Sequence, residues 1–202
     1  GSSLKAANIA ADLTETNARV ISSVEETSKY KFLPKKDIFD VEYWSLEQAK
    51  LKKEKKELEG SIVVITGAFG GIGTATYKLF KKYGAEVILI DNNKKKVDEM
   101  SKKLNDLCIY CDVTNKESVK RAFNLISSQF GGIDILISNA GTATGGSIAE
   151  VSDKILRKSF EDNFFSHQYC ASEATRIMKL QNNEGCLLFN ISKQSVNPGK
   201  NF

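Results

Sequence analysis

Apolar and polar positions alternate along most of the chain in a repeating strand-then-helix order. Five short apolar runs predict buried strands at residues 61–66, 86–91, 107–110, 133–138 and 186–191. Longer stretches with helical spacing separate them and predict helices at residues 71–83, 94–105, 114–130 and 152–181. Strands that take turns with helices build parallel sheets with right-handed crossovers. The predicted fold class for residues 60–202 is therefore a doubly wound, parallel α/β sheet.

Several residues indicate where the predicted helices begin and end. Gly84 ends the first helix, and Gly131 with Gly132 ends the third. Thr114 is the predicted N-cap of that third helix, with Glu117 three residues later as the second half of a capping box.

Residues 1–59 have a different pattern. Apolar side chains at near-helical spacing predict one amphipathic helix, with Ile9, Leu13, Val20 and Val24 on its apolar face. Residues 37–51 (DIFDVEYWSLEQAKL) then place Phe39, Tyr43 and Trp44 close together, a density typical of packing surfaces. A segment this short buries little core alone, so we interpret it as a helical arm or interdomain connector.

Composition and charge exclude several classes of protein. The 202 residues are 41% hydrophobic and 27% charged, which is ordinary for a globular chain. The net charge of +4 comes from lysines mixed with acids, as in residues 50–59, and this mixture indicates a solvated helix face rather than a nucleic-acid surface. No apolar run approaches the roughly 18 residues of a membrane span, and residues 1–13 do not resemble a secretory signal.

The four cysteines do not indicate a metal site. Cys108 and Cys111 form a lone C-x-x-C around a predicted strand, and His167 is the sole histidine of the sequence. Buried strand thiols explain this spacing better than metal ligands, so we predict no bound metal. Because the cysteines do not form a disulfide framework, we expect the protein to be located in the reducing cytoplasm.

Residues 65–73 (ITGAFGGIG) join the first strand to the first helix and contain four glycines. A turn this tight needs positions without a Cβ atom, and a pyrophosphate needs close approach to the backbone. The free amides and positive dipole end of the helix that starts near Gly71 would face such a group. Because the spacing does not fit G-x-G-x-x-G or a P-loop, a plain turn remains an alternative.

Polar residues also follow the other strands. Asp91 ends the second strand, where a carboxylate can bind both ribose hydroxyls of NAD and repel the 2′-phosphate of NADP, although it could also cap the next helix. Asp112 follows the third strand, and we expect it to reach an adenine ring. After the fourth strand Asn139 can brace the sheet, while Ala140 and Gly141 leave room for a cofactor.

Together these residues resemble the short-chain dehydrogenase/reductase family over residues 60–202. The resemblance rests on the loop TGAFGGIG and on residues after later strands, and it implies cofactor contacts from Thr66, Gly67, Gly71, Ile72, Gly73, Asp91, Asp112, Val113, Asn139, Ala140 and Gly141. It further implies hydride transfer between NAD(H) and a small alcohol or carbonyl compound. In the same way it implies that Asn163, on the long helix, holds a water molecule in a proton relay.

Part of the family's catalytic set is not found where the resemblance places it. A tyrosine followed four residues later by a lysine should come about a dozen residues after the fifth strand, but no tyrosine follows that strand in this sequence. Tyr77 and Lys81 have the spacing but lie in the first helix, so we interpret Tyr77 as a packing residue. Ser192 is the preferred candidate for the catalytic serine and Ser195 a poorer one; both could be ordinary loop serines. We therefore expect an incomplete domain that does not turn over.

Residues 6–60 resemble the connector of bacterial two-part enzymes that join a class II aldolase, of the rhamnulose-1-phosphate type, to a short-chain dehydrogenase. This resemblance implies a covalently linked aldolase domain and a sugar-derived alcohol or aldehyde as substrate. The alternative hypothesis is a non-catalytic NAD-binding module attached to that aldolase. The uncovered fifth strand indicates in addition that the chain is marginal in solution or pairs with another copy.

Overall fold

The computed structural model of the chain describes residues 4–42, 56–143, 146–147, 149–193 and 196–197. The chain forms two compact units, Gly1–Glu57 and Leu58–Phe202. The first unit contains helix α1 (Leu4–Glu25), which holds all four residues of the predicted apolar face, and helix α2 (Lys35–Glu42). Tyr43 and Trp44 lie outside the described residues. Among the helices that the structure describes, we find none with the length and apolar character needed to cross a membrane.

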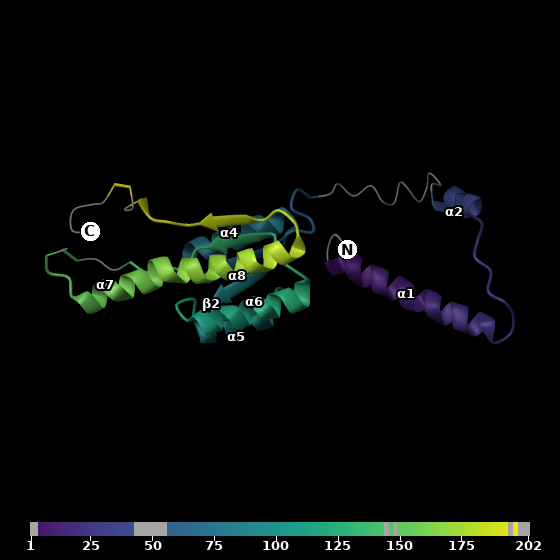
Figure 1. Cartoon of the computed structure of the whole chain (residues 1–202), viewed down its shortest axis with the longest axis horizontal. Coiled ribbons are helices and arrows are strands. Elements are labelled where there is room, and N and C mark those ends of the chain that lie inside the picture. Colours follow the sequence, from purple (N-terminus) through teal and green to yellow (C-terminus); the bar gives the residue numbers. More distant parts are fainter. Residues whose placement is uncertain (1–3, 43–55, 144–145, 148, 194–195, 198–202) are drawn as a thin grey trace. The chain divides into compact units, whose positions relative to one another are not determined.

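The second unit is built on five parallel strands in the order β3-β2-β1-β4-β5 (Figure 1). Their bounds are β1 (Ile62–Thr66), β2 (Glu86–Asp91), β3 (Cys108–Tyr110), β4 (Ile135–Ser138) and β5 (Cys186–Phe189). In the central register Ile65 of β1 lies opposite Leu89 of β2 and Ile137 of β4. The predicted parallel α/β fold is confirmed, with β4 starting two residues later and β5 ending two residues earlier than expected.

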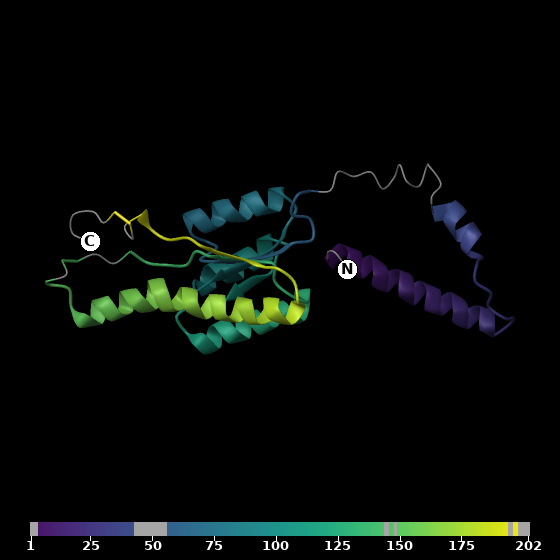
Figure 2. The same ribbon diagram turned by 45° about the horizontal axis from the view of Figure 1, so that its top comes forward.

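Helices cover both faces of this sheet (Figure 2). They are α4 (Gly71–Lys82), α5 (Lys94–Lys103), α6 (Lys116–Phe130), α7 (Asp153–Phe160), the π-helix η1 (Glu161–Phe165) and α8 (Ser166–Gln181). Alternate residues of a strand point to opposite faces. Val64 accordingly packs in one core cluster with Phe123 of α6 and Ile177 of α8, while Val63 packs in the other with Phe80 of α4. Four consecutive residues of β1, from Val63 to Thr66, are buried, as expected for a strand covered on both faces.

The N-cap of α6 differs from the prediction. Asn115 caps the helix, because its side chain accepts a hydrogen bond from the Ser118 amide at 2.9 Å. Thr114 comes one residue before this cap, and its amide and hydroxyl both donate to Oδ1 of Asp112, at 3.0 and 2.7 Å. The prediction of Thr114 as the cap was therefore wrong, since this threonine belongs to the preceding turn. Gly131 ends α6 in the left-handed conformation, as its position predicts.

The predicted helix over residues 152–181 is interrupted by η1. Helices α7, η1 and α8 run on as one long helix in Figure 1, with the five π-helical residues in the middle. The backbone amide of Ser166 bonds to the carbonyl of Glu161, five residues back, which is the π-type spacing. Such wider turns are frequent at functional sites, and this one contains Asn163.

Candidate functional site

A cavity of about 450 Å³ opens at the carboxyl ends of β1, β2, β3 and β4. Parallel α/β sheets bind their ligands at this edge. Eight of the predicted cofactor residues line the cavity: Gly67, Gly71, Ile72, Asp91, Val113, Asn139, Ala140 and Gly141. Residues that no local pattern indicated also line it, including Phe69, Lys96, Thr142 and Asp162.

Three of the four glycines of the β1–α4 turn have different environments. Gly67 has a φ of +62°, and a Cβ atom there would lie 2.9 Å from the Ala140 Cα. A Cβ on Gly73 would lie 2.3 Å from the carbonyl oxygen of Gly67, so this glycine allows α4 to pack against the end of β1. Gly71 has nothing within 4 Å of its Cβ position and faces open space. The turn is therefore shaped by Gly67 and Gly73, whereas Gly71 leaves the backbone accessible to a ligand.

The N-terminus of α4 supplies donors and positive charge to the cavity. Gly70 occupies the N-cap position without a side-chain cap hydrogen bond. First-turn amides of a helix lack intrahelical partners, and the helix dipole adds a partial positive charge there. Gly70, Gly71 and Ile72 all line the cavity, so this wall suits a phosphate group.

The carboxylate of Asp91 is held in a defined orientation next to this turn. Its Oδ2 accepts from the Phe69 amide at 3.0 Å, and its Oδ1 accepts from the Asn93 amide at 2.9 Å. Each carboxylate oxygen can accept more than one hydrogen bond, which leaves capacity for ribose hydroxyls. Asp91 is not the cap of α5, because the Asn93 side chain accepts from the Lys96 amide at 3.1 Å in that role.

Thr66 and Asn139 tie the ends of the strands together beneath the cavity. Thr66 Oγ1 accepts from the amides of Asn139 and Ala140 at 2.9 and 3.0 Å. The Asn139 Nδ2 donates to the carbonyls of Thr66 and Gly67, and its Oδ1 accepts from Asn190 Nδ2 at 2.8 Å. Asn139 thus braces β1, β4 and the residue after β5, as the sequence predicted. Thr66 is 1% exposed and shapes the site from below.

Three further residues predicted for the site are not part of the cavity lining. Of the residues that the structure describes, Asp112, Asn163 and Ser192 do not line it. Asn163 Oδ1 accepts from the Thr142 amide at 2.9 Å and so fixes the loop after Gly141. Ser192 is exposed beyond β5, and Ser195 lies outside the described residues.

Tyr77 and Lys81, which share the spacing of a catalytic pair, serve another purpose. The Tyr77 hydroxyl donates to Asp106 Oδ2 at 2.7 Å, and Lys81 Nζ lies 2.7 Å from Asp106 Oδ1. Burial, with the hydrogen bond to Asp106, raises the pKa of Tyr77 to about 12. A phenol with a raised pKa is a poor proton donor at neutral pH, and the ring packs against the core beside α4. Rejection of Tyr77 as the catalyst agrees with these contacts.

The cysteines are free thiols. Burial raises the pKa of Cys111 and of Cys170, so both behave as apolar core residues. Within the described part of the chain, no group of three or more His, Cys, Asp or Glu side chains is arranged to hold a metal ion.

Comparison with known proteins assigns the chain to a family. Residues 61–202 match the family model described as short chain dehydrogenase. The chain belongs to the short-chain dehydrogenase family. The family is an oxidoreductase family whose members bind a nicotinamide cofactor, in agreement with the glycine turn and the lining of the cavity. Residues 1–51 match a different model, the second domain of class II aldolases, which supports the predicted connector.

Individual relatives agree with this assignment. The chain is 32% identical to "Uncharacterized oxidoreductase YuxG" of Bacillus subtilis over 210 residues, which covers 100% of this chain and 30% of the relative. It is 34% identical to "Short chain aldehyde dehydrogenase 1" of Euphorbia lathyris, over 70% of this chain and 51% of the relative. The chain thus spans about half or less of the length of these relatives.

Solved structures show the same fold. The dehydrogenase domain resembles a short-chain type dehydrogenase/reductase from Mycobacterium marinum with a TM-score of 0.66 and 25% identity, over 71% of this chain and 60% of that one. It resembles gox2181 with a TM-score of 0.65 and 25% identity, over 71% and 58% of the two chains.

Proposed function

We propose that the cavity binds NAD(H) and that this domain serves an NAD-dependent dehydrogenase acting on a small sugar-derived alcohol or aldehyde. The single observation that carries the proposal is the Asp91 carboxylate, braced by the Phe69 and Asn93 amides in the wall of the cavity beside the glycine turn. A fixed carboxylate there accepts hydrogen bonds from both ribose hydroxyls and repels a 2′-phosphate.

Different residues of the chain would contact different parts of the cofactor. The amides of Gly71 and Ile72 would hold the diphosphate, and the ring of the base would lie past Asp91 against Val113, over the turn that Asp112 braces. Ala140 and Gly141 would leave space for the middle of the dinucleotide. When bound, the nicotinamide supplies the hydride acceptor or donor.

The first unit supports a proposal for the substrate and for the domain that is linked to the dehydrogenase. The match of residues 1–51 to an aldolase domain supports a covalently linked aldolase, which by its chemistry releases an aldehyde. We propose that the dehydrogenase acts on such a compound in the cytoplasm, in a protein that pairs with a second copy. We place Asn163 in the proton relay and Ser192 at the substrate oxygen.

One observation favours a second function for this chain by itself. Residues 190–202 contain no tyrosine, so this stretch supplies no phenol to protonate or deprotonate the substrate oxygen. A chain of this kind would bind NAD without turnover, as a nucleotide-binding module next to the aldolase. A dehydrogenase rate assay on the chain separates this function from catalysis.

Calorimetric titration with NAD and NADP tests the cofactor assignment. We expect NAD to bind at least about tenfold more tightly, because a 2′-phosphate would meet the charge of Asp91. The variant Asp91→Asn should raise the affinity for NADP and remove the preference.

Lys96 provides the matched control for this titration. It is the one cation among the described residues that line the cavity, and its Nζ donates to the Phe69 carbonyl at 3.3 Å. A lysine in this place could instead attract a 2′-phosphate. If Lys96→Gln removes binding of NADP, or if the wild-type chain binds both nucleotides equally, the role given to Asp91 is wrong.

A further inference from the structure

A second carboxylate lines the cavity, at a position that the sequence did not indicate. Asp162 lies in η1 and is 8% exposed, and it lines the cavity together with Thr142. A nearly buried carboxylate in a binding cavity is uncommon unless it is paired or used.

The side chain of Asp162 is fixed on both of its oxygens. Thr142 Oγ1 donates to Oδ2 at 2.9 Å, and the Lys158 ammonium, one helical turn earlier, donates to Oδ1. This hydrogen bond raises the pKa of Lys158. The backbone is fixed as well, since Ser166 Oγ donates to the Asp162 carbonyl at 2.7 Å. Because a carboxylate offers about four lone-pair sites, two remain for a ligand.

Two observations place this carboxylate beside the base of a bound dinucleotide. Asp91 marks the ribose, so the base lies farther along the cavity, toward Val113 and Thr114 at the end of β3. Asp162 itself lines this cavity together with Val113 and Thr114, the residues that follow β3.

Asp112, which we expected to reach the adenine ring, has its carboxylate bonded within its own turn instead. Oδ1 of Asp112 accepts both the amide and the hydroxyl of Thr114, and Asp112 is not among the described residues that line the cavity. Asp162 does line it, and its carboxylate is held by Thr142.

We infer that Asp162 reads the base of the nucleotide by accepting a hydrogen bond from the exocyclic amino group of adenine, while Thr142 and Lys158 hold its carboxylate in place. This inference rests on the proposed function, because it assumes a dinucleotide in the cavity. An ionised carboxylate accepts hydrogen bonds and does not donate them. It therefore favours a base with an amino group at C6 and repels one with a carbonyl oxygen there.

Nicotinamide hypoxanthine dinucleotide tests this inference, since it has a carbonyl oxygen in place of the amino group at C6 and a hydrogen on N1. In calorimetric titrations of the full chain we expect NAD to bind about tenfold more tightly, the typical effect of one hydrogen bond to a charged group. Asp162→Asn should bring the two affinities within about twofold, because an amide can present either its oxygen or its NH₂ group to the base.

Two further variants separate Asp162 from its surroundings. Asp153→Asn is the matched control: Asp153 is also bonded to a cation four residues away, Arg157, at 2.7 Å, but its side chain is 74% exposed. This variant should keep the wild-type preference. Asp112→Asn tests the competing assignment, that Asp112 reads the ring, since its carboxylate is bonded to Thr114 in the turn beneath the base.

The possible results are distinct. Equal affinity of the wild-type chain for both dinucleotides overturns the inference without any variant and leaves the proposed function standing. A preference that survives in Asp162→Asn, or that is lost in Asp112→Asn alone, also overturns it. Failure of the wild-type chain to bind either dinucleotide overturns the proposed function and the inference together.

Discussion

At the scale of single residues, the glycine turn separates positions that shape the fold from a position that faces the ligand. Gly73 is buried against the Gly67 carbonyl, whereas Gly71 has open space around its Cβ position. The sequence places both glycines in one loop and gives no means to tell them apart. The difference arises from how closely α4 approaches β1, which is a property of the folded chain.

Because of this difference, alanine at Gly73 should affect stability, whereas alanine at Gly71 should affect NAD binding. Gly73→Ala places a methyl group 2.3 Å from the Gly67 oxygen and should lower the free energy of unfolding by about 1–3 kcal/mol, the usual cost of overpacking. Gly71→Ala meets no atom within 4 Å and should leave stability within about 0.5 kcal/mol while weakening NAD binding severalfold. Urea denaturation and calorimetry measure the two quantities. Equal loss of stability in both variants would contradict the packing described.

Much of the site could be predicted from residues that follow strands. Asp91 and Asn139 stand directly after apolar runs, and parallel strands bring such positions to one edge of the sheet. Asp162 and Thr142 could not be found in this way. Thr142 lies in a long loop, and Asp162 lies in the middle of a helix, where a polar residue usually faces solvent. The spacing of Lys158 and Asp162, four residues apart, was a signal, but it is common on exposed helix faces.

At the scale of elements, helical periodicity predicts the long helix over residues 152–181 but not the π-helical turn inside it. The periodicity of apolar residues averages over several turns, so one wider turn leaves little trace in sequence. Its effect on the site is large, because η1 contains both Asp162 and Asn163, whose side chains bond to Thr142.

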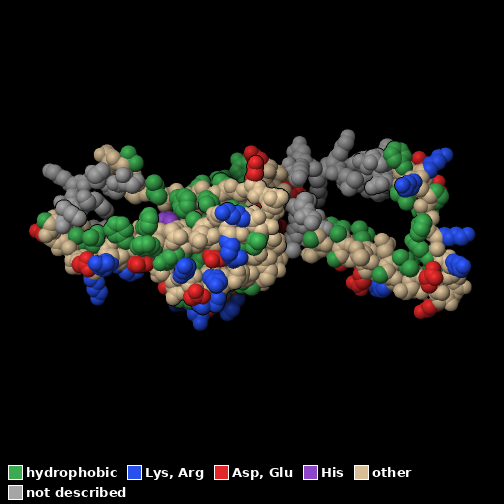
Figure 3. All heavy atoms as spheres, viewed as in Figure 1, with side chains coloured by type: hydrophobic (Ala, Val, Ile, Leu, Met, Phe, Trp, Pro, Cys, Tyr) green, Lys and Arg blue, Asp and Glu red, His purple; other side chains and the backbone are tan. Residues whose placement is uncertain are grey.

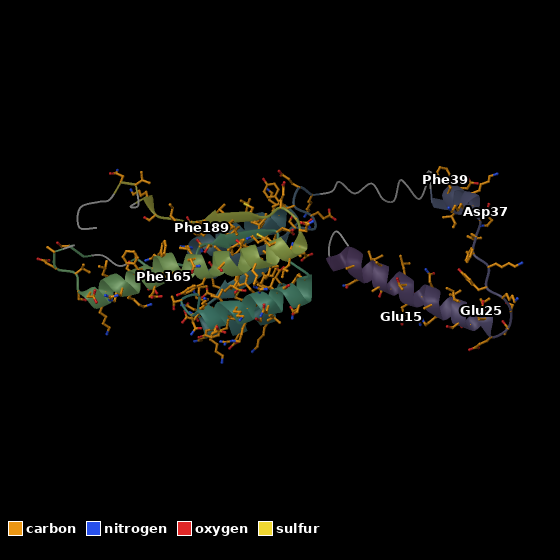
Figure 4. The ribbon with its side chains drawn as sticks, in the orientation of Figure 1. Glu15, Glu25, Asp37, Phe39, Phe165 and Phe189 are labelled. Atoms are coloured by element: carbon orange, nitrogen blue, oxygen red, sulfur yellow. The ribbon has the colours of Figure 1, made fainter. Side chains whose placement is uncertain are left out.

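Helix α8 docks on the sheet through the sole histidine of the chain. His167 Nδ1 lies 2.6 Å from Oγ of Ser138 in β4, and its ring packs edge-to-face on Phe189 of β5 at 5.9 Å. On the neighbouring turn Phe165 stacks on Tyr169 at 6.2 Å; Figure 4 labels both phenylalanines. Burial lowers the pKa of His167, because the charged imidazolium is poorly solvated there.

The lowered pKa of His167 predicts a dependence of stability on pH. The unfolded chain, with a histidine pKa of about 6.5, binds this proton more readily than the folded chain does. The free energy of unfolding should therefore be highest above about pH 6.5 and should fall as the pH drops below that value. Urea denaturation between pH 5.5 and 8 measures this change, before most carboxylates titrate. In His167→Gln the slope should flatten, and an unchanged slope in that variant would rule out the assignment.

At the scale of the whole molecule, the described sheet ends at β5 with an exposed strand. All four residues of β5 are exposed, including Leu188 at 47% and Phe189 at 43%. Phe160 and Phe164 are also more than half exposed, and hydrophobic side chains gather along α7 on the face shown in Figure 3. Charges of both signs are interspersed over the rest of that face, so this apolar strip is the better candidate for contact with another chain.

We expect the chain to self-associate through this surface. Sedimentation velocity over a range of concentrations should show a dimer, because an open edge strand with apolar side chains pairs readily. Leu188→Lys should weaken association by about tenfold or more, since a charge on an edge opposes pairing. Leu79→Lys is the control, because Leu79 is 51% exposed but lies on α4. A monomer at every concentration, or equal effects of both variants, would contradict this expectation.

A crystal structure of the chain with NAD tests the central claim most directly: that the turn between β1 and α4 holds a dinucleotide. We predict diphosphate oxygens at hydrogen-bond distance, about 3 Å, from the amides of Gly71 and Ile72, with the adenosine ribose hydroxyls on Asp91. A diphosphate bound elsewhere, or a turn filled by the protein's own side chains while NAD is present, would contradict the claim.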